Sequence, residues 1–287
     1  MWEYGNMRMR KWGIEKMRKL MGVALIVLGA GMAWAGVNEF EAKPETRYML
    51  TYDWTVEGEC RDFAEDPTGR SKVYNYRGNE YATECLYFAA ASGESCVGRM
   101  ALVPGKSGRM QHEFYTASDT VKVRVEARPP KGCKARLENV ALTEVTDAPT
   151  LNVNPDFKLG LYNYSGVSGC NDNAVVLLPS PSGGVALHGG FYVYLAKTPV
   201  RPGGRYNLEM KAQGWHRKVR MDGSFVFLDA AGKKVFTSDI PRYGRDSKRP
   251  GESLVKNIEF IAPEDARWVY LWLYGATVEY ARITEKK

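Results

Sequence analysis

Aromatic side chains gather at residues 268–274, which read Trp-Val-Tyr-Leu-Trp-Leu-Tyr. Because successive side chains of a strand point to opposite faces, a strand here puts the aromatic rings on one face and the aliphatic side chains on the other. Flat rings in a row can stack on the apolar faces of sugar rings, and an exposed patch of this kind marks an interaction site. The candidate ligand-binding rings are Trp268, Tyr270 and Trp272, with Tyr274 in the same row.

Burial or a protein contact would account for the same aromatic row. Aromatic residues dominate cores and interfaces, so the rings could be buried beneath residues 151–195 or against the first half of the chain. Contact with a protein partner is the third alternative. Exposure of Trp268 and Trp272 separates these alternatives, because a surface that stacks on a ligand must be accessible.

Two polar loops add candidate residues for the recognition of hydroxyl groups. Residues 161–173 carry Tyr162 and Tyr164 among Gly, Ser, Asn and Asp, whose polar side chains can hydrogen-bond a hydroxyl but also serve ordinary turns. Trp215 follows a predicted strand and stands just before the cationic Arg217. We expect either a stacking ring at a loop tip or an aromatic anchor that packs the loop.

A third loop, residues 242–249, combines cations with an aromatic ring. It reads Arg-Tyr-Gly-Arg-Asp-Ser-Lys-Arg, and loops are common places for binding residues. Tyr243 could stack on a sugar while Arg242 and Arg245 pair with a carboxylate or a sulfate. This arrangement favours an anionic polysaccharide as ligand, and a solvated loop is the plain alternative.

The sequence offers few residues in patterns typical of a catalytic site. The chain has 3 His, all far apart in the sequence, and neither a G-x-S-x-G motif nor a glycine-rich phosphate loop is present. Acidic residues for glycoside hydrolysis, which needs a carboxylate pair, carry no motif. We therefore expect no enzymatic activity. A polysaccharide lyase or hydrolase accessory, with Tyr243 beside Arg242 and Arg245, is the remaining enzyme alternative.

The first 35 residues predict export. A basic segment, Lys-Met-Arg-Lys at 16–19, precedes an apolar run at 21–35, which ends in Ala-Trp-Ala before Gly36. This order is that of a secretory signal peptide, and the run is shorter than the ~20 residues that span a membrane. We expect residues 1–35 to be removed, with no stable membrane insertion afterwards. The expected location is secreted, periplasmic or cell-surface; an uncleaved anchor is the alternative.

Charge and cysteine usage narrow the class further. The formal net charge is +7, but residues 1–35 contribute +4 of it. The small charge that remains weakens the case for a nucleic-acid partner, which a clustered basic face would indicate. Disulfides are allowed in an exported chain. Spacing favours Cys85–Cys96 across a hairpin and Cys60–Cys133 between loop ends, although three pairings of these four are possible.

The elements that must position these residues are strands. After residue 35 the chain consists of short alternating segments broken by Gly, Pro, Asn and Asp, which is typical of sandwiches and barrels, and its last two strands are expected at 268–274 and 277–284. Four blocks recur in the same order in both halves. The pairs are 47–50 with 205–208, 86–93 with 225–232, 113–127 with 259–273, and 135–145 with 277–285.

The repeat predicts an all-β fold of two β-sandwich (jelly-roll-like) domains in tandem. We place domain 1 at residues 36–148 and domain 2 at residues 151–287. Residues 151–195 have no counterpart in the first half, so domain 1 lacks N-terminal strands. Where domain 2 has its aromatic row, the aligned strand of domain 1 has Lys122, Arg124 and Glu126, which indicates a solvated face there.

Three stretches resemble the galactose-binding-like, jelly-roll carbohydrate-binding modules of bacterial polysaccharide-degrading systems. Residues 154–160, Asn-Pro-Asp-Phe-Lys-Leu-Gly, are similar to the family's opening N-x-x-F-E-x-G stretch, with Lys158 where an acid is usual. Residues 202–208 match Pro-Gly-x-x-Tyr-x-Leu, and residues 137–142 resemble the closing F-D-D/N-V-x-L strand, from which residues 278–283 depart further. The resemblance covers most of residues 45–287.

This resemblance implies a polysaccharide or a cell-surface glycan as partner. It also implies a structural calcium, for which Asp156 and Glu279 are the candidate ligands. Calcium takes 6–8 oxygens, and Lys158, at a position where the family usually has an acid, argues against such a site. Because a fold does not by itself confer sugar binding, a structural or adhesive cell-surface protein is the second hypothesis. In that case the aromatic row is buried between domains or against a protein.

Overall fold

The computed structural model describes residues 37–58, 83–102, 107–129, 132–159, 167–170, 176–179, 185–214, 222–240 and 254–286. Within these ranges all regular structure is β, and no helix in them is long and apolar enough to cross a membrane. The strands are β1 (Val37–Glu41), β2 (Arg47–Gly58), β3 (Thr83–Ala90), β4 (Gly93–Ala101), β5 (Ser107–Tyr115), β6 (Thr120–Arg128), β7 (Cys133–Glu144), β8 (Val167–Cys170), β9 (Val176–Pro179), β10 (Val185–Leu195), β11 (Thr198–Pro199), β12 (Arg205–Gly214), β13 (Asp222–Leu228), β14 (Lys234–Asp239), β15 (Leu254–Ile261) and β16 (Trp268–Glu285).

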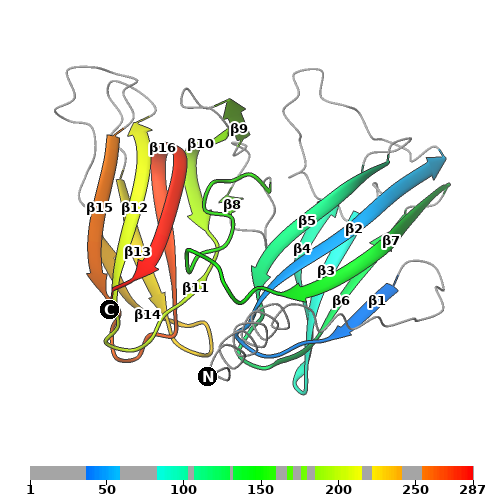
Figure 1. Ribbon diagram of the computed structural model, residues 1–287, viewed down its shortest axis with the longest axis horizontal. Coiled ribbons are helices and arrows are strands. Elements are labelled where there is room, and N and C mark those ends of the chain that lie inside the picture. The colour runs from blue at the N-terminus through cyan, green and yellow to red at the C-terminus, as the bar shows by residue number, and fades with distance from the viewer. Residues whose placement is uncertain are drawn as a thin grey trace, which may run out of the picture.

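Domain 1 is an antiparallel sandwich made by β1 to β7 (Figure 1). One sheet has the order β1-β6-β3-β4 and the other the order β5-β2-β7. Alternation along β6 shows how the core forms: Val123 and Val125 are fully buried, while Lys122 and Arg124, which alternate with them, point outward. The side chains buried between the two sheets include Leu50, Tyr52, Leu86 and Phe114.

Domain 2 is built around one long strand, β16. Its first half pairs with β13 on one side and with β10 and β11 on the other, and its second half pairs with β12. The strand therefore serves both layers of the sandwich, and the core lies between them. The sequence predicted two strands here, at 268–274 and 277–284, which was wrong in that detail: β16 is one strand, and β10 pairs with it on both sides of Gly275, across an irregularity in the register.

The tandem sandwich class predicted from the repeat is confirmed. The order β5-β2-β7 in domain 1 corresponds to β15-β12-β16 in domain 2, and β6-β3-β4 corresponds to β16-β13-β14. Within the described ranges, domain 1 has one short strand before β2, whereas domain 2 has four, β8 to β11, before β12. The limits of the domains at residues 148 and 151 stay a prediction, since the described strands fix only that the sheets divide between Glu144 and Val167.

Equivalent contacts also recur in both domains. The Lys43 amide donates a hydrogen bond to the Tyr48 hydroxyl at 3.0 Å, and the Arg201 amide donates to the Tyr206 hydroxyl at 2.7 Å. Next to these contacts Lys43 forms an ion pair with Glu144, as Arg201 does with Glu285. The two halves are therefore copies of one structure and not only of one strand pattern.

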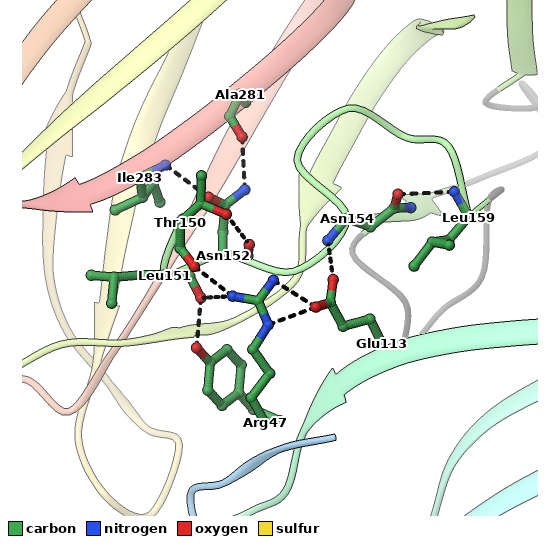
Figure 2. A network of polar contacts seen from close by, with 10 residues as sticks. Arg47, Glu113, Thr150, Leu151, Asn152, Asn154, Leu159, Ala281 and Ile283 are labelled. Carbon is green, nitrogen blue, oxygen red and sulfur yellow. Dashed lines mark hydrogen bonds and ion pairs between the residues drawn. The ribbon is translucent and has the colours of Figure 1, made fainter. Parts of the chain in front are cut away.

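Domain 1 holds the segment that joins the two sandwiches. The guanidinium of Arg47, at the start of β2, donates hydrogen bonds to the carbonyls of Thr150 and Leu151 and forms a buried ion pair with Glu113 at 2.7 Å (Figure 2). The other Glu113 oxygen accepts a hydrogen bond from the Asn154 amide at 2.9 Å. Burial of this ion pair is tolerated because both charges are hydrogen-bonded as well as paired.

Domain 2 holds the same segment from the opposite side. The Leu151 amide donates to the Ile283 carbonyl at 2.7 Å. The Asn152 side chain donates to the Ala281 carbonyl and accepts from the Ile283 amide, both at 2.7 Å (Figure 2). The joining segment therefore fixes the position of one sandwich against the other.

Candidate ligand-binding site

The aromatic row lies on the outer face of β16, as alternation predicts. Val269, Leu271 and Leu273 are fully buried in the core of domain 2, so the rings between them point the other way. Trp268 is buried, with 6% of its surface exposed, whereas Tyr270, Trp272 and Tyr274 are partly exposed. The row is thus covered at one end and partly exposed along the rest, where Tyr270 and Trp272 also pack against the cluster around Trp268.

Domain 1 covers the buried end. Tyr115, the last residue of β5, meets Trp268 edge-to-face with 6.2 Å between the ring centroids. Val226 and Leu228 of β13 complete this cluster on the domain 2 side. The Tyr115 hydroxyl donates to the Leu151 carbonyl at 2.7 Å, which ties the covering ring to the joining segment.

A further ring, Tyr194 of β10, extends the row sideways. It lies opposite Trp272 in the strand register, and its ring is 5.9 Å from that of Tyr270. The sequence analysis missed it, although the alternation Phe-Tyr-Val-Tyr-Leu at 191–195 carries the same signal. We call the partly exposed set Tyr194, Tyr270, Trp272 and Tyr274 the aromatic shelf.

The aromatic shelf ends in a pocket of about 780 Å³ at the domain junction. We call it the junction pocket. Its aromatic lining includes Tyr115 from domain 1 with Tyr194, Trp268 and Tyr270 from domain 2. Polar lining residues come from both domains: Ser118 and Asp119, and Lys197.

The equivalent face of domain 1 is occupied by ion pairs, as its charged residues predicted. Lys122 pairs with Glu39 at 2.6 Å, and Arg124 pairs with Glu94 and Glu126. The Arg124 guanidinium lies 4.1 Å above the Tyr87 ring. Its hydrogen bonds to Glu94 hold the pKa of that carboxyl below the ordinary range. On this face the charged side chains pair with one another, and they stand at the positions where domain 2 has its aromatic rings.

The predicted loop residues lie outside the described part of the chain. They are Tyr162, Tyr164, Trp215, Arg217, Arg242, Tyr243 and Arg245. Their role in binding stays a prediction.

The predicted disulfides also stay predictions. In the pairing of β3 with β4, Cys96 lies opposite Tyr87 and Cys85 opposite Arg99, and no bond joins these two cysteines in the structure. Cys60 and the side chain of Cys133 lie outside the described residues.

The two carboxylates predicted for calcium each face a cation of the protein. Asp156 Oδ1 is 2.9 Å from Arg282 Nη2, and Glu279 Oε2 is 2.9 Å from Lys211 Nζ. Among the described residues no group of three or more His, Cys, Asp or Glu could hold a metal ion. These side chains thus fit ion pairs better than the 6–8 oxygens that calcium takes, and metal removal is the test.

Fold and site together define a tandem β-sandwich protein with an aromatic surface beside its domain junction. No protein-family model matches the chain, and no curated protein matches it. The tandem CBM22-1–CBM22-2 domains of Paenibacillus barcinonensis Xyn10C align at 10% identity over 86% of this chain and 82% of that one, with a TM-score of 0.36.

Two other solved structures illustrate the range of the alignments. The C-terminal CBM6 of LamC from Zobellia galactanivorans is 16% identical over 41% of this chain and 93% of that one, with a TM-score of 0.27. An allantoicase is 10% identical over 90% and 80%, with a TM-score of 0.31. At such values the class of this protein rests on its own strands and contacts.

Proposed function

We propose that this chain is an exported, non-catalytic protein that binds a polysaccharide or cell-surface glycan on the aromatic shelf of domain 2. The observation that carries the proposal is the row of partly exposed rings Tyr270, Trp272 and Tyr274 on the outer face of β16. The wet face of a sheet ordinarily alternates with polar residues, as the equivalent face of domain 1 does. Rings kept at such positions indicate an interaction surface.

The dimensions of the aromatic shelf suit more than one sugar ring. Residues two apart on a strand are separated by about 7 Å, so the rings from Tyr270 to Tyr274 extend over about 14 Å. Ser224, opposite Trp272 on β13, donates a hydrogen bond at 2.8 Å to the exposed carboxylate of Asp239. This carboxylate beside the shelf can accept hydrogen bonds from sugar hydroxyls, while the rings stack on the apolar faces.

Export and the lack of catalysis are inferred from the sequence. The first 35 residues have the order of a signal peptide. His112, one of the 3 His, is fully buried and close to the Tyr52 hydroxyl, so it cannot act as a base on a substrate. Several of the aligned structures are carbohydrate-binding modules, which agrees with the proposal without carrying it.

The test is affinity gel electrophoresis of the chain after signal removal, in gels that contain β-1,4-glucan, xylan, β-1,3-glucan or pectate. We expect at least one polysaccharide to retard the protein, and Trp272→Ala to weaken that binding by about tenfold, equal to about 1.4 kcal/mol, because a stacking ring is lost. Lys122→Ala is the matched control, since it removes an exposed side chain from the equivalent face of domain 1. Retardation by none of the four, or equal retardation of Trp272→Ala, would contradict the proposal.

The second candidate function, a structural or adhesive protein, is favoured by one observation. Trp268 is buried against Tyr115, so part of the aromatic row does serve a contact between domains. If the shelf served a protein partner in the same way, polysaccharides would not retard the chain, and Trp272→Ala would change only protein capture.

A further inference from the structure

The junction pocket and the aromatic shelf share two rings. Tyr194 and Tyr270 belong to the shelf and also line the pocket, beside the buried Trp268. A ligand that lies along the shelf toward Trp268 therefore reaches the pocket without crossing any other surface. The pocket's volume of about 780 Å³ lies inside the range of roughly 300–1,000 Å³ typical of small-molecule sites.

Domain 1 lies at the Trp268 end of the aromatic shelf. Tyr115 covers Trp268, and the turn after β5 adds Ser118 and Asp119 to the far wall of the pocket. An extended chain that follows the shelf toward Trp268 therefore meets side chains of domain 1, since Tyr115 lies against that ring.

The pocket is formed before any ligand arrives. Arg47 and Glu113 clamp the joining segment on the domain 1 side (Figure 2). At the pocket itself the Ser118 hydroxyl donates to the Ala230 carbonyl of domain 2 at 3.1 Å. Preformed walls lower the cost of ordering on binding.

We infer that the junction pocket receives the terminal sugars of a glycan chain whose next sugars stack on the aromatic shelf. This inference rests on the proposed function and adds to it that recognition is of chain ends, with domain 1 as part of the site. Lys197, Asp119 and Ser118 supply donors and acceptors for the terminal hydroxyls, and the rings supply apolar contact. Such a mixture of mostly apolar lining with a few polar groups is usual for ligand sites.

The experiment compares chain ends with chain interiors by calorimetric titration of the chain after signal removal. The probes are hexasaccharides of β-1,4-glucose, β-1,4-xylose and β-1,3-glucose and the polymers with the same linkages. We expect one hexasaccharide to bind within about threefold of the Kd of its polymer counted per chain, with one protein bound per polymer chain. Several proteins bound along one polymer chain would overturn the inference.

Two test substitutions, Ala231→Trp and Lys197→Ala, and one control, Lys233→Trp, separate this inference from the proposed function. Ala231→Trp fills the pocket from the turn between β13 and β14 and should weaken hexasaccharide binding at least tenfold, while Lys233→Trp adds the same bulk outside the pocket lining and should not. Lys197→Ala, which cannot disturb packing because the side chain is exposed, should weaken binding several-fold.

One outcome would overturn the chain-end inference alone. In it, Trp272→Ala loses binding, while Ala231→Trp and Lys197→Ala both bind as the unaltered protein does. Retardation in none of the four gels together with binding of no probe would overturn the proposed function and the inference; retardation in a gel without binding of the matching hexasaccharide, that of pectate included, would overturn the inference alone.

Discussion

His112 lies on the core side of β5 with none of its surface exposed, and its Nε2 is 2.8 Å from the Tyr52 hydroxyl. Burial lowers the pKa of His112 from 6.5 to about 3. In the unfolded chain the imidazole takes up a proton below about pH 6.5, while in the folded chain it stays neutral down to about pH 3. Its neutral form therefore favours folding above pH 6.5, and this advantage is lost progressively as the pH falls from 6.5 to 3.

We expect the free energy of unfolding to fall by about 2–3 kcal/mol between pH 6.5 and 4.5 from this residue. Urea denaturation at a series of pH values measures it. His112→Gln keeps a polar partner for Tyr52 but does not titrate, so its stability should fall less steeply over the same range. Equal slopes for the two proteins would show that His112 is not the cause.

Single residues also show how far the sequence predicts the site. Alternation correctly assigned Val269, Leu271 and Leu273 to the core, because the period of a strand is a local property. The exposure of the rings between them is not local: Trp268 is buried by Tyr115, which is 153 residues earlier in the chain. The sequence alone therefore could not decide whether the aromatic rings are exposed or buried.

At the scale of the element, β16 explains which strand predictions succeeded. The repeated blocks correctly located strands in both halves, since each block carries its own apolar alternation and turn. The same blocks split β16 into two at Gly275, since the residue types there resemble a strand end. Pairing with β10 on both sides of Gly275 keeps the strand continuous, and such pairing depends on a strand that is distant in the sequence.

The second half of β16 also contains residues that allow the predicted calcium site to be tested. Arg282 and Lys211, from β16 and β12, already neutralise Asp156 and Glu279, so we expect neither EDTA nor added calcium to change the melting temperature by more than about 1 °C. Differential scanning fluorimetry of the chain after signal removal measures this. A bound ion would instead raise stability with the logarithm of its concentration. A rise of several degrees with millimolar calcium, reversed by EDTA, would restore the calcium site that the resemblance implies.

At the scale of the whole molecule, the junction determines whether the two sandwiches behave as one body. Unfolding of domain 1 alone would expose Trp268, Val226 and Leu228 and strip the joining segment of its hydrogen bonds to Arg47. The coupling cannot be inferred from the repeat, because the equivalent residues of domain 2, Arg205 and Glu259, are exposed. In domain 1 the joining segment and the Tyr115 ring both lie against the Arg47 guanidinium of the equivalent pair.

Arg47→Met tests this coupling. The substitution leaves Glu113 buried without its cation, which typically costs about 3–5 kcal/mol, and it removes the donors to the Thr150 and Leu151 carbonyls. We expect the unaltered chain to melt in one calorimetric transition and Arg47→Met to melt in two, with domain 1 melting first. Arg205→Met is the matched control at the exposed equivalent position and should change stability by less than about 0.5 kcal/mol. If both variants melt alike in one transition, the sandwiches are not coupled through Arg47. A chain-end pocket built from both domains would then need another source of rigidity.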